Sequence, residues 1–283
     1  MGRPIFSARL WRTLFILAPF FAVSIFWAAP QMSHAEDNIA SDSELLNLTA
    51  YKRVFTEDFD DLDVSDKECD TRWIAHTPYN GDFGDARFAN PTKRFPFRIS
   101  NSVLRIEASK DYEGNWESGL LSSQNPCGTG YTQLYGYFES RIKLPAGEGV
   151  WPAFWFLTND QDGFRGEIDA IEFYGHAPKK FQSAFQLHPL DSDAERFAQN
   201  NWLDVDSDTL TEDFNLYGVS IEEDFMTFYF NRKPYWQVKT PDEFKQPWYI
   251  LVNLALGSGY SIENTPSPSY MYVDYIHAYQ KAP

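Results

Sequence analysis

The chain has 283 residues, of which 43% are hydrophobic and 17% aromatic, so it is long enough to form one large core or two small ones. Its formal net charge is −16 at pH 7. A surface this acidic repels nucleic acid and anionic membranes, and it argues weakly against a strongly anionic polymer as substrate, whereas neutral polymers meet no such penalty.

Residues 1–35 have the layout of a secretory signal peptide. Three arginines precede an apolar run over residues 14–29, and Ser33 and Ala35 supply the small residues of a cleavage site. Cleavage after Ala35 would remove three positive charges and move the formal charge from −16 to −19. The alternative is an uncleaved membrane anchor, for which the apolar run is short and interrupted by Pro19. We expect a secreted or periplasmic protein.

The segment after the signal peptide, residues 36–50, is polar and acidic, and we expect a flexible lead-in to a single domain over residues 51–283. The chain has two cysteines, Cys69 and Cys127. In an exported protein they favour one disulfide, and two free buried thiols are the alternative.

From residue 52 onward, short apolar or alternating runs are separated by Gly, Pro, Asn and Asp. Many short strands without a long helical period indicate an all-β sandwich or jelly roll. The expected strands cover residues 53–55, 103–108, 135–144, 153–157, 167–172, 181–188, 216–221, 226–230, 249–255 and 270–279.

The strand around residues 151–156 alternates two kinds of large side chain. Trp151 and Trp155 share one face, and Phe154 and Phe156 share the other. The Phe face is the more apolar, so we expect the Trp face to line a cleft where indole rings stack on sugars. The alternative is that both Trp side chains fill the core.

Three carboxylates, Glu167, Asp169 and Glu172, lie within six positions of a strand-forming stretch. Glu167 and Asp169 share a face, but a regular strand would turn Glu172 into the core, where an unpaired carboxylate is costly. One extra residue at Ala170 or Ile171, a β-bulge, returns Glu172 to the acid face. The stretch therefore predicts three acids lining one cleft.

Two carboxylates in different environments can hydrolyse a glycosidic bond, one as nucleophile and one as acid. The spacing of Glu167 and Glu172 puts their Cα atoms roughly 13 Å apart. Side chains leaning inward leave about 5 Å, which favours retention over inversion. Asp169, between them, can keep their protonation states different.

Three alternatives compete with this interpretation. The acids could bind Ca²⁺, although calcium favours looping segments with backbone carbonyls. They could form a solvated strand face paired with basic residues, of which only Arg165 is near. The fold could also bind sugar without cleaving it, as a lectin does.

Three features follow the acids along the chain. His188 and its same-face neighbour Gln186 could line the same cleft, although a lone strand His is more often structural. A short helix is expected around residues 193–200. Residues 231–234 (NRKP) are typical of a hairpin turn.

The motif over residues 167–172 resembles the bulged E-x-D-x-x-E signature of glycoside hydrolase family 16, in the form found in laminarinases and other bacterial endo-β-glycanases. The resemblance extends over about residues 53–280. It rests on further similar stretches at residues 135–145, 149–155, 217–219, 253–257 and 273–276.

The resemblance implies a β-jelly-roll sandwich of two curved antiparallel sheets, the concave one forming a glycan-binding cleft. It implies that Glu167 is the nucleophile, Asp169 its assistant and Glu172 the general acid/base. Trp155 and Trp151 would stack on sugars. It also implies a structural calcium near Asp274, with a plain surface carboxylate as the alternative, and no cofactor for catalysis.

We therefore expect a secreted endo-β-glycanase that hydrolyses internal β-glycosidic bonds by a retaining mechanism, with β-1,3 or mixed β-1,3/1,4-glucan as substrate. The alternatives are depolymerisation of a bacterial exopolysaccharide, transglycosylation by the same residues, and a non-catalytic glycan-binding sandwich. We expect a monomer whose partner is the polysaccharide, with neither nucleic acid nor membrane bound after signal cleavage.

Overall fold

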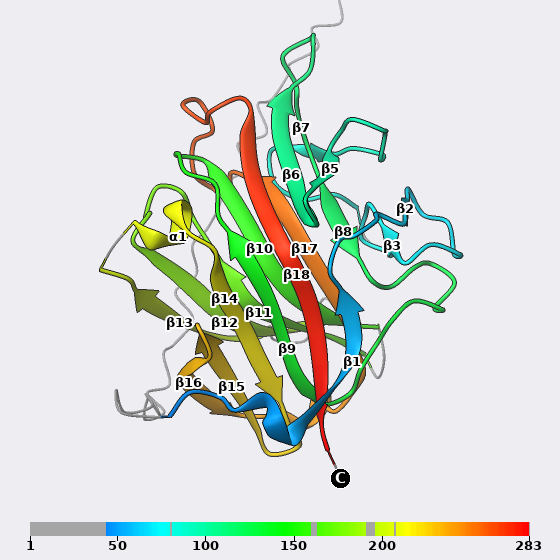
Figure 1. Ribbon diagram of the computed structural model, residues 1–283, viewed down its shortest axis with the longest axis vertical. Coiled ribbons are helices and arrows are strands. Elements are labelled where there is room, and N and C mark those ends of the chain that lie inside the picture. Colours follow the sequence, from blue (N-terminus) through cyan, green and yellow to red (C-terminus); the bar gives the residue numbers. More distant parts are fainter. Residues whose placement is uncertain (1–43, 80, 160–162, 191–195, 207, 283) are drawn as a thin grey trace, which may run out of the picture. The chain divides into compact units, whose positions relative to one another are not determined.

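The computed structural model describes residues 44–79, 81–159, 163–190, 196–206 and 208–282 (Figure 1). The predicted signal peptide, its cleavage site near Ala35 and the first part of the predicted lead-in lie outside these residues. The described part of the lead-in contains a 3-10 helix, η1 (Leu48–Ala50), which leads directly into the first strand, β1 (Tyr51–Glu57). No helix in this described part of the chain is long and apolar enough to cross a membrane.

The described residues form two large sheets. A ten-stranded sheet has eight strands in one path, with β1 paired to β18 and β5 (Phe97–Ser100) paired to β6. The path runs β16 (Lys233–Lys239), β15 (Phe225–Phe230), β14 (Asn215–Ile221), β9 (Gly136–Lys143), β18 (Ser269–Lys281), β6 (Val103–Lys110), β7 (Trp116–Ser118), β4 (Arg87–Phe88).

The second sheet has eight strands in the described residues, and Figure 1 shows its central strands behind β9, β18 and β14 of the first. Its order is β13 (Phe197–Asp204), β12 (Lys180–Pro189), β11 (Phe164–Glu172), β10 (Val150–Thr158), β17 (Trp248–Leu256), β8 (Leu120–Ser122), β3 (Trp73–Ile74), β2 (Val64–Ser65). The all-β jelly-roll prediction is confirmed. The expectation of purely antiparallel sheets needs one correction, because the very short strands β2 and β4 pair parallel with β3 and β7.

The main core lies between the two sheets. Along β6 every second residue is buried, and Leu104 and Ile106 face the other layer with no exposed surface. From the second sheet, Phe154 and Phe156 enter the same core fully buried, as the alternation in the sequence predicts. Burying each of these large side chains contributes roughly 1.5–3 kcal/mol to folding. The opposite face of β10, which carries Trp151 and Trp155, therefore does not face this core.

The short helix expected around residues 193–200 is wrong where the structure describes it. Residues 197–200 belong to β13, which pairs along its whole length with β12. The burial of β13 alternates between exposed and half-buried positions, so the strand period of two governs this segment. Residues 191–195 lie outside the described part. The helix in this region is instead α1 (Thr209–Glu212), one turn long.

The predicted hairpin turn is confirmed between β15 and β16. Asn231 and Arg232 have φ angles of 50° and 63°. Two consecutive residues with positive φ are typical of the turn that matches the twist of a two-residue hairpin, and Asn is among the residues that adopt this conformation most readily.

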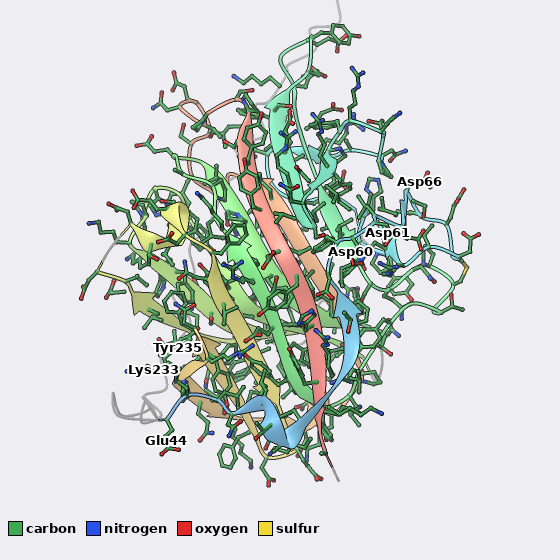
Figure 2. The ribbon with its side chains drawn as sticks, in the orientation of Figure 1. Glu44, Asp60, Asp61, Asp66, Lys233 and Tyr235 are labelled. Atoms are coloured by element: carbon green, nitrogen blue, oxygen red, sulfur yellow. A yellow bond between two sulfur atoms is a disulfide. The ribbon has the colours of Figure 1, made fainter. Side chains whose placement is uncertain are left out.

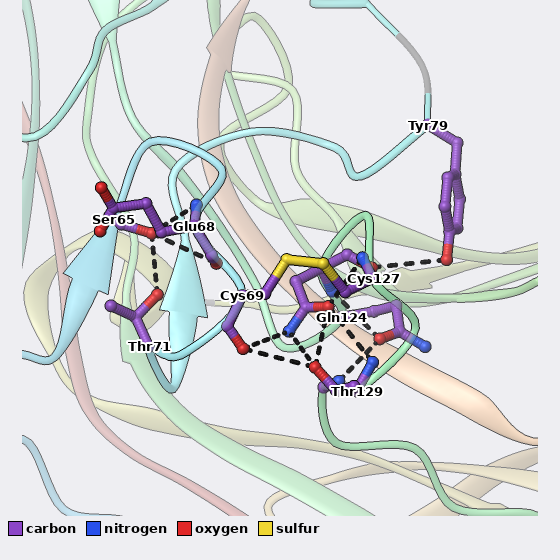
Figure 3. The surroundings of a disulfide bond; sticks show 10 residues. Ser65, Glu68, Cys69, Thr71, Tyr79, Gln124, Cys127 and Thr129 are labelled. Carbon is purple, nitrogen blue, oxygen red and sulfur yellow. Dashed lines mark hydrogen bonds between the residues drawn. A yellow bond between two sulfur atoms is a disulfide. The ribbon is translucent and has the colours of Figure 1, made fainter.

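The predicted disulfide between Cys69 and Cys127 is present (Figure 3). It closes a loop of 58 residues and joins the segments that precede β3 and follow β8 at one end of the second sheet. Asn125 Nδ2 and Thr129 Oγ1 each donate to the Cys69 carbonyl oxygen at 3.3 Å. A loop of this length corresponds to roughly 4 kcal/mol of stabilisation through the unfolded chain.

The acidic charge of the chain lies partly on a surface segment beside this disulfide. Asp60, Asp61 and Asp66 are exposed near β2 (Figure 2). The charge of the buried Glu57 is compensated within the fold. Arg72 Nη1 forms an ion pair with Glu57 Oε2 at 2.8 Å, and Trp73 Nε1 donates a hydrogen bond to the same oxygen at 2.7 Å.

Candidate active site

The three carboxylates lie on β11, beside the tryptophan strand β10. The register pairs Leu157 with Glu167, Trp155 with Asp169 and Ala153 with Glu172. Between the last two pairs, β11 advances three residues while β10 advances two. The same irregularity appears against β12, where Asp169 and Glu172 face Ala184 and Gln182.

The predicted β-bulge is therefore confirmed at residues 170–171. Ala170 and Ile171 are both fully buried, so the extra residue is absorbed on the core side of the strand. Glu172 returns to the face of Glu167 and Asp169, which satisfies the requirement that an unpaired carboxylate stays out of an apolar core.

The three acids open into one cavity of about 320 Å³. Trp151, Ala153 and Trp155 line it from β10, so the prediction that the Trp face lines a cleft is confirmed. Leu157 of β10 also lines it, and the remaining lining residues come from the loop before β4 and from neighbouring strands: Thr77, Gly81, Phe83, Arg165, His188 and Asn253. Part of this sheet face is covered by a second apolar cluster that includes Phe88 and Tyr249.

Glu167 is held by two donors on β12. Gln186 Nε2 donates to Glu167 Oε1 at 2.6 Å, and His188 Nε2 lies 3.0 Å from Oε2. The register places Gln186 directly opposite Glu167. A carboxylate can accept on both oxygens, so these two contacts fix the orientation of the Glu167 side chain. The sequence indicated that Gln186 and His188 could line the cleft. Of the two, His188 lines the cavity, and both contact Glu167.

Asp169 lies between the glutamates and is only 3% exposed. Burial raises its pKa well above the usual range, and the charges of Glu167 and Glu172 raise it further. A hydrogen bond with Gln186 opposes the shift. Its Oδ2 is buried and accepts no hydrogen bond from the described residues. A proton on this oxygen would relieve both the burial and the crowding of negative charge.

Glu172 has a different environment. Burial raises the pKa of its carboxyl, and the charge of Glu167 adds to the shift, while hydrogen bonds from Trp151 and Tyr174 oppose it. Trp151 Nε1 and the Tyr174 hydroxyl both donate to Oε1, each at 3.1 Å. An indole N–H can only donate, so Oε1 is an acceptor in either protonation state. Two donors on the same oxygen suit the carbonyl-type oxygen of the neutral acid, which leaves Oε2 for the proton.

The two tryptophans are fixed by polar and aromatic contacts. Trp155 Nε1 donates to Asn253 Oδ1 at 2.7 Å, and the residue is 7% exposed. Phe83 meets both indoles edge to face, at 5.6 Å from Trp155 and 5.5 Å from Trp151. Trp151 also lies nearly parallel to Tyr174, with ring centroids 6.4 Å apart. Stacking of either indole on a sugar stays a prediction, and Trp155 has little free surface for it.

Sequence reasoning missed Tyr174, Asn253 and Phe83 as parts of the site. Tyr174 could have been found, because it follows Glu172 by two positions and a strand places such residues on one face. Asn253 lies in a stretch that carries the family resemblance, but nothing in its own spacing indicates a tryptophan partner. Phe83 comes from a loop, and only the tertiary fold brings it over β10.

The structure does not support the calcium expected near Asp274. The Asp274 Oδ2 atom lies 2.7 Å from Arg141 Nη1 in an ion pair. Within the described ranges there is no group of three or more His, Cys, Asp or Glu residues that could hold a metal ion. The carboxylate already has a cationic partner, so the alternative of a surface carboxylate agrees better with its contacts.

Comparison with known proteins agrees with this geometry. The family model described as "Glycosyl hydrolases family 16" matches residues 87–277. The chain is 28% identical over 274 residues to the endo-1,3-1,4-beta-glycanase EglC of Rhizobium meliloti, covering 89% of this chain and 56% of that protein. It is 31% identical over 194 residues to ExsH of the same organism, also described as an endo-1,3-1,4-beta-glycanase, covering 65% and 39% of the two chains.

Among solved structures, the laminarinase catalytic domain of Thermotoga maritima has a TM-score of 0.64 and 25% identity, covering 82% of this chain and 99% of that one. The chain thus spans about half the length of the two Rhizobium relatives and nearly all of this catalytic domain.

Proposed function

The chain belongs to glycosyl hydrolase family 16, and on that premise we propose that it is an endo-β-glycanase acting by a retaining double displacement. One observation carries the proposal. Two glutamates share a cleft in opposite environments, with Glu167 accepting hydrogen bonds on both oxygens and Glu172 having a pKa raised by burial. A nucleophile needs the first environment and a general acid the second.

In the first step, a Glu167 oxygen attacks the anomeric carbon while the glycosidic C–O bond breaks. Glu172 Oε2 gives its proton to the leaving oxygen, because Oε1 is engaged by Trp151 and Tyr174. Asp169 in its protonated form limits the negative charge beside Glu167 before attack.

In the second step, Glu172 is ionised and takes a proton from water through Oε2. The water oxygen attacks the anomeric carbon, the bond to Glu167 breaks, and both carboxyl groups return to their starting states. A sugar hydroxyl in place of water would give transglycosylation by the same residues.

The proposed substrate is a β-1,3- or mixed β-1,3/1,4-glucan. EglC is described as an endo-1,3-1,4-beta-glycanase and the Thermotoga maritima structure as a laminarinase, which supports this class. The formal charge of −16 also favours a neutral polymer. Assaying laminarin, mixed-linkage glucan, agarose, carrageenan and an acidic exopolysaccharide, with the products sized, tests the choice. Release of only monosaccharide would contradict an endo-acting enzyme.

The variant Glu167→Gln tests the catalytic assignment. The amide keeps the shape of the side chain but cannot serve as nucleophile, so we expect turnover to fall by several orders of magnitude with an unchanged melting temperature. A matched control is Glu148→Gln, an exposed-loop glutamate outside the cleft, which should leave turnover intact. Near-normal turnover by Glu167→Gln would refute the assignment.

We also propose that the protein is exported and acts as a monomer without a cofactor for catalysis. The support for export is the sequence of residues 1–35, with its basic start, apolar run and small residues at the end. N-terminal sequencing of the protein from culture medium or periplasm tests it, with an N-terminus near Glu36 expected. An intact N-terminus in a membrane fraction would favour the uncleaved anchor.

A further inference from the structure

A second cavity lies on the outer face of the ten-stranded sheet and plays no part in the proposed reaction. Its volume is about 510 Å³, and its lining includes Arg98, Ile99, Val103, Arg105, Phe214 and Tyr272. We call it the outer-face pocket. On β6, Leu104 and Ile106 point into the core, so Arg105 between them points away from it. The pocket and the acid cleft therefore lie on opposite outer faces of the sandwich, and one sugar ring cannot contact both.

A row of cations crosses this face. The register pairs Arg98 on β5 with Arg105 on β6, Arg105 with Tyr272 on β18, and Tyr272 with Lys143 on β9. Directly opposed residues have Cβ atoms about 5 Å apart, and like charges in this position are destabilising. Two arginines facing each other thus run against the local electrostatics, although the net charge of −16 attracts cations overall.

Carboxylates of the chain neutralise only part of this row of cations. Arg105 Nη2 pairs with Glu107 at 2.8 Å, and its guanidinium lies 4.4 Å from the centre of the Tyr270 ring. Its Nε is buried and donates to no acceptor within the described residues. Arg98, which is exposed, and Lys143 make no ion pair or side-chain hydrogen bond in that same part of the chain. Hydrogen-bond donors that can bind an anion are therefore left at the rim of the pocket.

The pocket also has an apolar and aromatic wall. Tyr272 is half-buried on β18, and Phe214 is half-buried just before β14. Arg141 lies 4.7 Å from the centre of the Phe214 ring and is held by Asp274, so the ring has a fixed neighbour on one side. Aromatic rings of this kind pack against the C–H faces of sugars while polar groups at the rim fix orientation.

We propose that the outer-face pocket binds a sugar residue that carries a carboxylate, such as a uronic acid or an acid-substituted unit of a polysaccharide. A guanidinium matches a carboxylate with two parallel hydrogen bonds, and Arg98 opposite Arg105 presents such groups next to Tyr272. The site holds an acidic glycan without cleaving it. Its cations offset locally the repulsion that the net charge imposes, and a glucan segment covalently linked to the acidic unit is thereby held on the same molecule as the cleft.

The test is calorimetric titration of the full chain with trigalacturonate, with cellotriose as the neutral comparison. We expect trigalacturonate to bind more tightly than cellotriose. Arg98→Gln should weaken trigalacturonate binding about tenfold, the factor that corresponds to about 1.4 kcal/mol. Arg98→Lys, which keeps the charge but loses the planar fork, and Tyr272→Ala should also weaken it. Hydrolysis of mixed-linkage glucan by Arg98→Gln should not change.

Lys52→Gln is the matched control, because Lys52 is an exposed cation on β1 of the same sheet and outside the pocket. It should leave binding unchanged. The proposal is overturned if the unaltered chain does not bind trigalacturonate, if Arg98→Gln binds as well as the unaltered chain, or if Lys52→Gln weakens binding equally. Equal affinity for inorganic phosphate would also overturn it, since that would leave no role for the aromatic wall.

Discussion

Removing the Tyr174 hydroxyl should move the alkaline limb of activity to higher pH. The hydroxyl donates to Glu172 Oε1 at 3.1 Å and stabilises the ionised carboxylate, which opposes the effect of burial on the Glu172 pKa. In Tyr174→Phe that opposition is lost, so Glu172 stays protonated to higher pH. A general acid must be protonated, and the limb of kcat/KM that falls with rising pH therefore moves upward.

The size of the effect follows from the hydrogen bond. A bond to a charged group contributes on the order of 1.5 kcal/mol, which corresponds to a limb shift of about one pH unit, and less if Trp151 Nε1 compensates. We also expect kcat to fall several-fold, since only the indole then orients Oε1. The phenyl ring keeps its place beside Trp151, so the fold should be preserved.

The assay is kcat/KM on a soluble mixed-linkage glucan from pH 4 to 10. Tyr260→Phe is the matched control, because Tyr260 packs 5.8 Å from Tyr174 in the same aromatic group but is 46% exposed and does not line the acid cleft. Its profile should match that of the unaltered enzyme. An alkaline limb that stays in place, or moves to lower pH, in Tyr174→Phe would refute the account of Glu172.

Three further predictions concern the acid cleft and the disulfide. Asp169→Asn should raise the melting temperature at pH 8 but not at pH 3. The pKa of Asp169 is higher in the folded state than in the unfolded state, so the native protein loses stability as the pH rises from the unfolded-state pKa to the folded-state pKa. An equal change in melting temperature at both pH values would contradict this. Gln186→Leu should lower kcat by roughly tenfold or more through the loss of the 2.6 Å bond to Glu167, whereas Gln280→Leu, an exposed glutamine on β18 of the other sheet, should not. Replacing Cys69 and Cys127 by Ser should reduce the free energy of unfolding by roughly 2–4 kcal/mol in denaturant titrations, with kcat unchanged in the folded protein; unchanged stability would mean that the crosslink does not constrain the unfolded chain.

Most of the correct predictions from the sequence came from the alternation of side chains between the two faces of a strand. It separated Trp151 and Trp155 from Phe154 and Phe156, and the structure places the first pair in the cleft and the second in the core. It also required the bulge, because burying Glu172 unpaired is costly. The local sequence was sufficient to predict these positions because one face of each strand packs against the core and the other does not.

The segment over residues 197–204 shows where sequence reasoning failed. No residue of this edge strand is fully buried, so its hydrophobic alternation is weak, and the expectation of a helix around residues 193–200 is wrong for the first half of β13. Its conformation is set by pairing with β12, which is a tertiary contact. The same holds for Phe83 and for Tyr272 beside Arg105, where residues far apart in sequence meet through the register of the sheets.

The outer-face pocket changes how the net charge is interpreted. Composition argued weakly against an anionic polymer because charge was counted over the whole chain. The register of four neighbouring strands concentrates cations in one row, with Arg98 and Lys143 at its ends. A net charge describes long-range repulsion, whereas recognition depends on which groups share a face.

The most direct test of the catalytic account is to trap the covalent intermediate. The enzyme is incubated with a β-glucosyl or β-laminaribiosyl fluoride whose 2-hydroxyl is replaced by fluorine, digested, and analysed by mass spectrometry. The account predicts one glycosyl adduct, on the peptide that contains the bulged acid strand, with fragmentation assigning it to Glu167. An adduct on Glu172, or no adduct together with products of inverted anomeric configuration, would contradict it.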